Sequence, residues 1–325
     1  MRFVPDHTLR MLSEQDYENA VTTVEATLDE LRETGRFTAR DGASLYYEYF
    51  LAEDSVASVV LVHGLSEFTR KFYELIHYLL SHGMNVFTYD QRCHGLSDRL
   101  TDHHDMLHVD RFDDYVEDLA LFVDTVVRPV TDKPLYLYTH SMGGATGALF
   151  LAQYPAVFEK AVFTAPMFEP VVEQVPVPIA RVGVWVGRLL CGSKAKFPLS
   201  REFNPEVKYH PSQGTSRARF EHHIAMRRDN PDYQSTPMSY GWVWGSLTVG
   251  RRILRRRAAA KIKTPILILS AGDDTVVNNR PQHVFAARVD SCRLVTIDGA
   301  THGMLASDNE TLERILRLIL DHYSA

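Results

Sequence analysis

The sequence has few cysteines, no excess of positive charge and no long uninterrupted apolar run. Its three cysteines, Cys93, Cys191 and Cys292, are odd in number and widely scattered. We therefore expect free thiols in a reducing compartment, and neither a disulfide framework nor a metal site. The net charge of −6 argues against nucleic acid as a partner, because phosphate binding needs a basic surface.

Segments typical of export or membrane insertion are also missing. Residues 1–10 lack the apolar core of a secretion signal. The nearest candidate for a membrane span, residues 171–191, is interrupted by two prolines and two arginines. These features predict a soluble cytoplasmic protein.

Short apolar runs alternate with amphipathic segments over most of the chain. We expect strands at residues 43–51, 59–62, 85–89, 135–138, 160–164, 266–270 and 293–297. We expect helices at residues 13–34, 71–81, 112–127, 142–153, 281–288 and 310–322. This alternation predicts an α/β fold with a mostly parallel central sheet flanked by helices.

The alternation fails between residues 166 and 261, which are richer in proline, arginine and aromatic side chains. We interpret residues 166–261 as a mainly helical lid inserted into a core of residues 1–165 and 262–325, with residues 1–35 as an N-terminal helical extension. Such a lid would cover the carboxyl ends of the strands, where open sheets place their sites.

Ser141 follows an expected strand and precedes an expected helix. The sequence around it, Thr-His-Ser-Met-Gly at residues 139–143, approximates the G-x-S-x-G turn that exposes a nucleophilic hydroxyl above the sheet. Thr139 replaces the first glycine of that turn, so we expect a local adjustment where strand and helix pass closely.

An acid and a histidine follow Ser141 in the chain order that this architecture uses. His302 lies after the last expected strand and would act as the base. Asp273 and Asp274 both follow the strand at residues 266–270, and we favour Asp274 because it precedes Thr-Val-Val. The backbone N–H groups of Leu65, after the strand at residues 59–62, and of Met142 are the expected oxyanion donors.

Together these segments resemble the serine-hydrolase family of monoacylglycerol lipases and bacterial lysophospholipases, often labelled serine aminopeptidase-like. The similarity includes His-Gly-Leu-Ser-Glu at residues 63–67, Asp-Gln-Arg-Cys-His-Gly-Leu-Ser at residues 90–97 and His-Ser-Met-Gly-Gly at residues 140–144. Cys93 stands where the second motif usually has glycine. The resemblance implies an α/β-hydrolase fold and, through residues 216–243, a substrate with one acyl chain.

The leading hypothesis is hydrolysis of a single-chain lipid ester through an acyl-enzyme on Ser141, with no cofactor and no metal. A short-chain carboxylesterase or an aminopeptidase could use the same three residues. An aminopeptidase would need lid carboxylates to hold the substrate amine, and Glu202, Glu206 and Glu221 are available. A catalytically idle ligand-binding relative is a further alternative.

Other features have two interpretations each. The basic run at residues 251–263 is either a solvated helix face or a surface for anionic lipid head groups, which would allow peripheral membrane contact. The apolar side chains of Val182, Trp185, Val186 and Leu189 either pack against the core or line an acyl pocket. Trp242 and Trp244 either lie in the lid core, which we favour, or contact a ligand. For Arg92 we expect a structural role, in which it ties its loop to neighbouring backbone.

Overall fold

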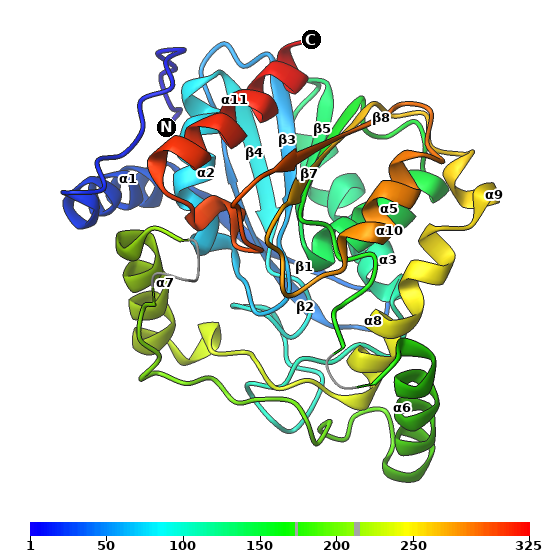
Figure 1. Ribbon diagram of the computed structural model, residues 1–325. Helices are drawn as coiled ribbons and strands as arrows, with labels where there is room; N and C mark the ends of the chain where they lie inside the picture. The colour runs from blue at the N-terminus through cyan, green and yellow to red at the C-terminus, as the bar shows by residue number, and fades with distance from the viewer. Residues whose placement is uncertain (173–174, 211–214) are drawn as a thin grey trace.

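The computed structural model describes residues 1–172, 175–210 and 215–325 (Figure 1). Its strands form one sheet in the order β1-β2-β4-β3-β5-β6-β7-β8. Their bounds are β1 Glu33–Thr38, β2 Ser44–Phe50, β3 Ala57–Val62, β4 Met84–Tyr89, β5 Leu135–His140, β6 Lys160–Thr164, β7 Ile266–Ala271 and β8 Cys292–Ile297. Strands β3 to β8 are parallel, and β2 runs antiparallel to β1 and β4. The predicted mostly parallel sheet is confirmed.

Helices cover both faces of the sheet. Those of the core are α1 Tyr17–Leu31, η1 Thr69–Phe72, α2 Tyr73–Ser81, α3 Asp113–Phe122, η2 Val123–Val127, α4 Arg128–Val130, α5 Met142–Gln153, α10 Asn279–Ala286, η5 Met304–Ala306 and α11 Asn309–Ser324. Val59 and Leu61 of β3 pack with α2 and α11, while Val60 and Val62 pack with α3 and α5. This alternation explains why the parallel strands read as continuous apolar runs.

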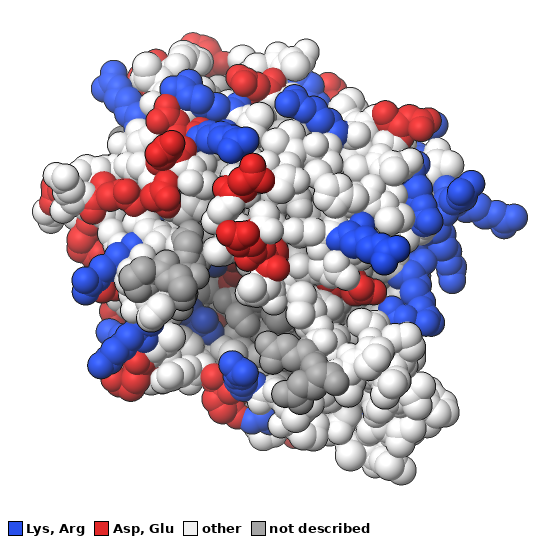
Figure 2. All heavy atoms as spheres, in the orientation of Figure 1, with Lys and Arg blue, Asp and Glu red and all other residues white. Residues whose placement is uncertain are grey.

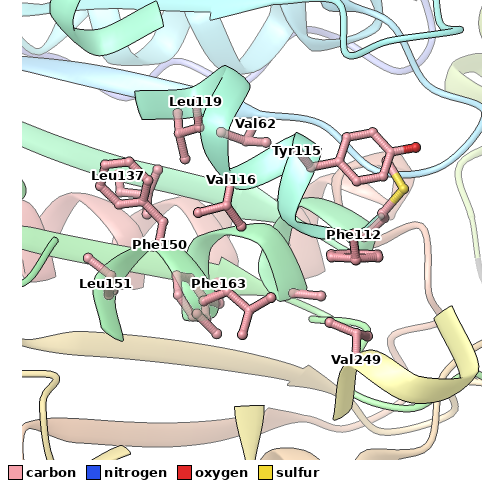
Figure 3. Packing of buried hydrophobic residues seen from close by; sticks show 14 of the residues in the cluster. Val62, Phe112, Tyr115, Val116, Leu119, Leu137, Phe150, Leu151, Phe163 and Val249 are labelled. Atoms are coloured by element: carbon pink, nitrogen blue, oxygen red, sulfur yellow. The ribbon is translucent and has the colours of Figure 1, made fainter. Parts of the chain in front are cut away.

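The cluster on the α3 and α5 face is the larger of the two, and Figure 3 shows part of it. Val62 and Leu137 of the sheet belong to one buried cluster with Val116 and Leu119 of α3 and Phe150 of α5. Burying an apolar side chain of this size typically contributes about 1.5–3 kcal/mol. The core therefore holds the carboxyl ends of β3 and β5, and the loops that follow them, in fixed relative positions.

The insertion between β6 and β7 is helical in the described residues, as predicted. It contains α6 Val177–Cys191, α7 Arg217–Asp229, η4 Pro231–Tyr233, α8 Tyr240–Ile253 and α9 Arg256–Ala259. In Figure 1 helices α6, α7 and α8 lie towards the carboxyl ends of the strands, with α7 at one corner and α6 at the opposite corner, whereas α9 lies on the side of α5. Helix α6 packs on α8, and α7 packs on α1. None of the helices in the described part of the chain is long and apolar enough to cross a membrane.

The N-terminal helix is shorter than its sequence pattern suggested. We expected a helix at residues 13–34, but α1 ends at Leu31, and Thr34 belongs to β1. Strand β1 was not predicted, because only Phe37 among its side chains is buried and the strand has no clear apolar alternation. Its pairing with β2, Phe37 opposite Leu45, is a contact that local patterns do not encode.

Candidate functional site

Ser141 occupies the sharp turn between β5 and α5. Its backbone has φ 51° and ψ −115°, a conformation that is rare for residues other than glycine. The Ser141 N–H donates to the Thr164 carbonyl at 3.1 Å, and the Gly144 N–H donates to the Ser141 carbonyl at 2.9 Å. These bonds from neighbouring elements hold the strained turn, which directs the hydroxyl away from the sheet.

The adjustment expected around Thr139 is found in helix α5. Thr139 is fully buried, and a Cβ atom added to Gly147 would lie 2.9 Å from its Cγ2 methyl. A side chain at residue 147 would therefore collide with the threonine. Glycine in the helix provides the space that glycine in the turn usually provides.

His302 lies between Ser141 and Asp274. Its Nε2 is 2.8 Å from the Ser141 Oγ, and its Nδ1 is 2.8 Å from the Asp274 Oδ2. The other carboxylate oxygen of Asp274 accepts the N–H groups of Val276 and Val277 at 2.8 and 2.9 Å. Burial acts to raise the Asp274 pKa, but the hydrogen bonds from His302 and the backbone leave it below its ordinary value. Asp274 therefore stays an anion beside His302.

Asp273 lies apart from this arrangement. It is exposed, and its backbone N–H donates to the Ala300 carbonyl. The side chain of Asp274 is fully buried, by contrast. Of the two aspartates, Asp274 is the one in contact with His302, which is the arrangement that the sequence favoured.

The loop after β3 passes next to Ser141. His63 Nε2 accepts the Gln91 N–H at 2.9 Å, so its Nδ1 carries the proton and donates to the Gly64 carbonyl at 2.7 Å. The Gly64 carbonyl and the Leu65 N–H belong to one planar trans peptide group and point in opposite directions. His63 therefore orients the peptide group that carries the N–H of Leu65.

The two expected oxyanion donors are free to bind. In the part of the chain that the structure describes, neither the Leu65 N–H nor the Met142 N–H donates a hydrogen bond. Met142 is the first residue of α5, where backbone N–H groups have no partner within the helix. Both N–H groups can therefore donate a hydrogen bond to a ligand oxygen.

Sequence patterns assigned no role to Glu67, Lys71 or His140, which surround this loop. Glu67 accepts the Gly64 N–H at 2.6 Å and the Lys71 ammonium at 2.5 Å. All three side chains line a small cavity that is closed on the other side by α11. The only signal for Glu67 was its place in the His-Gly-x-x-Glu pattern, and no pattern pointed to Lys71.

The lid contacts the site at two places. Trp242 of α8 is buried, as expected, and its indole N–H donates to the Met142 sulfur at 3.3 Å. Tyr233 stacks on Phe68 with ring centroids 3.9 Å apart. These contacts hold the lid against Met142, at the start of α5, and against Phe68, which follows the loop that carries Leu65.

Several other expectations need correction. Val182, Trp185, Val186 and Leu189 of α6 are all exposed, so the alternative in which they pack against the core is wrong. Arg92 does not bind neighbouring backbone. Instead it forms ion pairs with the carboxylates of Asp118 and Asp41, each at 2.7 Å.

The basic run at residues 251–263 is not one helix face, because it spans the end of α8, a turn and α9. Arg252 is paired with Asp113, whereas Arg255 to Arg257 are exposed. The carboxylates considered for amine binding, Glu202, Glu206 and Glu221, are also exposed. Two of them already pair with a cation: Glu202 with Lys196, and Glu221 with Arg217. Among the described residues, no group of three or more His, Cys, Asp or Glu side chains is placed to hold a metal ion.

Comparisons with known proteins agree with this architecture. The family model described as serine aminopeptidase, S33, matches residues 53–310. Lysophospholipase L2 of Escherichia coli (strain K12) is 29% identical over 313 residues, which cover 90% of this chain and 88% of the relative. Monoglyceride lipase of Mus musculus is 32% identical over 128 residues, which cover 39% of this chain and 41% of the relative.

Solved structures show the same fold. A soluble variant of monoglyceride lipase from Saccharomyces cerevisiae, in complex with a substrate analog, superimposes with a TM-score of 0.72 at 17% identity. The match covers 90% of this chain and 94% of the other. Monoacylglycerol lipase from Paleococcus ferrophilus gives a TM-score of 0.65 at 19% identity, covering 85% and 97% of the two chains. The predicted α/β-hydrolase fold is confirmed.

Proposed function

Because this chain belongs to the serine aminopeptidase S33 family and is a hydrolase of the lysophospholipase and monoglyceride lipase type, we propose that it cleaves a carboxylic ester of a single-chain lipid through an acyl-enzyme on Ser141. The observation that carries this proposal is the chain of two 2.8 Å contacts from the Ser141 Oγ through His302 to Asp274. A serine is a useful nucleophile only when a base can take its proton.

In the proposed first step, the Ser141 Oγ attacks the ester carbonyl carbon while His302 Nε2 takes its proton. The backbone N–H groups of Leu65 and Met142 bind the negatively charged oxygen that forms. His302 then gives the proton to the leaving alcohol as the ester C–O bond breaks. Water releases the fatty acid by the same steps, and Asp274 stabilises the histidine cation in both halves.

The lipid part of the proposal rests on the relatives, since lysophospholipase L2 and monoglyceride lipase are both named for single-chain lipid substrates. A short-chain carboxylesterase with the same residues is the alternative. Aminopeptidase activity has less support, because Glu202, Glu206 and Glu221 are exposed.

Peripheral contact with a lipid surface is a second part of the proposal. Helix α6 exposes a group of large apolar side chains: Ile179, Val182, Trp185, Val186, Leu189 and Leu190. In Figure 2 uncharged atoms cover α6 at the lower right, and blue side chains gather at the right edge around α9. Apolar side chains beside basic ones favour a membrane with anionic head groups. We expect binding to anionic vesicles, measured by sedimentation, to weaken at least about tenfold in Leu189→Asp/Leu190→Asp, because two leucine side chains no longer enter the lipid.

The test of the catalytic proposal compares purified wild type with Ser141→Ala on four substrate classes. These are lysophosphatidylcholine, monoacylglycerol, short p-nitrophenyl esters and aminoacyl amides. We expect the highest kcat/KM on a single-chain lipid and no turnover by Ser141→Ala. A preference for short esters or amides would remove the lipid assignment, and equal turnover by both proteins would remove Ser141.

A further inference from the structure

Glu67 holds the peptide group between His63 and Gly64, which directly precedes the peptide group that carries the Leu65 N–H. Its Oε2 accepts the Gly64 N–H at 2.6 Å, and its side chain is 7% exposed. His63 holds the next peptide group, which contains the Leu65 N–H, by donating to the Gly64 carbonyl at 2.7 Å. Residues 63–67, which we call the oxyanion loop, are therefore fixed at Gly64 from both sides.

The oxyanion loop is in close contact with the nucleophile. A Cβ atom added to Gly64 would lie 2.9 Å from the Ser141 Cβ and 2.7 Å from the Glu67 Oε2. Gly64 thus lies between the carboxylate and the serine. The Glu67 side chain is therefore hydrogen-bonded to backbone that lies next to Ser141.

A buried carboxylate at this place creates an electrostatic problem. The ester oxygen becomes negative next to the same loop, and a like charge nearby opposes it. His63 and His140 cannot cancel the carboxylate at neutral pH, because burial lowers the pKa of each to about 4. Although burial opposes ionisation of Glu67, the Lys71 ammonium at 2.5 Å brings its pKa well below the ordinary value. Lys71 is therefore the cation in direct contact with Glu67, while Arg227 of α7 acts on the same carboxylate at longer range.

We infer that Glu67 and Lys71 form a charge-neutral pair that positions the oxyanion loop. Glu67 holds the Gly64 N–H in place, and Lys71 cancels the carboxylate charge beside the developing oxyanion. Both are positioning residues, and the inference rests on the proposed function, because it concerns the same reaction at Ser141.

Single and double variants separate position from charge. Glu67→Ala releases Gly64, and we expect kcat to fall about 10- to 100-fold with KM changed less than about threefold. Lys71→Met leaves the carboxylate unneutralised, and we expect a fall of about tenfold in kcat. Glu67→Gln keeps an oxygen for the Gly64 N–H without a charge, so its kcat should stay within about threefold of wild type.

The double variant Glu67→Gln/Lys71→Met gives the decisive comparison. It removes both charges and retains the acceptor, so its kcat should recover to within about threefold of wild type. Lys71→Arg should also retain activity, because it keeps the positive charge. A merely structural pair would instead show additive losses, with the double variant as weak as Lys71→Met or weaker.

Glu313 and Arg317 on α11 supply a matched control, because they form an exposed carboxylate–cation pair with the same four-residue spacing. Glu313→Ala and Arg317→Met should leave kcat unchanged. Every variant is first checked for its melting temperature and titrated with a fluorophosphonate, so that only folded sites are counted. Kinetic constants are then measured on a single-chain lipid and on p-nitrophenyl acetate.

The outcomes distinguish this inference from the proposed function. Absence of Ser141-dependent turnover in wild type would reject the proposed function and the inference with it. An active wild type with Glu67→Ala and Lys71→Met both within threefold of it would overturn the inference alone. A folded double variant no faster than Lys71→Met would also overturn it.

Discussion

Replacing Arg219 with methionine tests how the lid is attached to the core. Arg219 belongs to α7, and its side chain is completely buried. Its guanidinium donates two hydrogen bonds to Glu74 of α2, at 2.7 and 2.9 Å, and others to the Ser307 carbonyl and Asn309 at 3.0 and 2.8 Å. One side chain therefore joins the lid to a core helix and to the segment that follows His302.

The size of the expected loss in stability follows from the Glu74 charge that remains without a partner. Arg219→Met leaves the Glu74 carboxylate, which is only 12% exposed, without its cation. Breaking one partner of a buried pair typically costs about 3–5 kcal/mol. For 325 residues the unfolding entropy is roughly 0.7 kcal/mol/K, so Tm should fall by about 4–7 °C if the chain unfolds as one unit.

Differential scanning calorimetry of two variants provides the comparison. Arg217, two positions away on α7, is exposed and pairs with Glu221, so Arg217→Met should leave the melting temperature nearly unchanged. Adding Glu74→Gln to Arg219→Met should recover part of the loss, because the unpaired charge is gone. A melting temperature for Arg219→Met within about 1 °C of that for Arg217→Met would refute the reasoning, because loss of a buried pair requires a shift several times larger.

Two further predictions concern the acid and the pH response. Asp274→Asn should lower kcat about 10,000-fold, because His302 Nδ1 loses its acceptor. The kcat of Asp273→Asn should stay within about twofold of wild type. Steady-state kinetics on p-nitrophenyl acetate measure both variants. His222 of α7 lies 3.1 Å from Glu25 and 3.3 Å from Glu18, and although burial acts to lower its pKa, these carboxylates leave it raised. A raised folded pKa means that the stabilisation is fully present below the ordinary histidine pKa and is lost as the pH rises through the raised value. The difference in unfolding free energy between wild type and His222→Gln, measured by urea unfolding, should therefore be about 1 kcal/mol at low pH and shrink towards zero in alkali. A difference that grows with pH would contradict this assignment.

Much of the core could be predicted because its elements have strong local signals. Residues 59–62, 135–138 and 160–164 are short apolar runs of the kind that a buried parallel strand requires, and each lies within an observed strand. The serine turn, the acid loop and the histidine loop were predicted from their order along the chain, since the carboxyl ends of parallel strands meet at one edge. In the structure Ser141, His302 and Asp274 lie in contact, and their catalytic roles stay a proposal.

The rest depends on contacts between distant residues. The apolar pattern of α6 left two alternatives, packing against the core or lining an acyl pocket, because a pattern does not show what covers a helix face; Trp185 and Leu189 are exposed in the structure. Strand β1 is defined by its pairing with β2, and the side-chain pattern of β1 alone does not predict this pairing. The Glu67–Lys71 pair matters in the proposed reaction because Gly64, which Glu67 binds, lies next to Ser141. The sequence does not show that Ser141 lies next to the oxyanion loop.

The most direct test of the central claim is covalent labelling with a fluorophosphonate, followed by peptide mass spectrometry. We predict one adduct per chain on the peptide that contains Ser141, and loss of that adduct in Ser141→Ala. We also predict much slower labelling in His302→Ala, because the contact between His302 and the serine hydroxyl is 2.8 Å. Labelling on another residue, or equal labelling of wild type and Ser141→Ala, would contradict the role of Ser141 as the nucleophile.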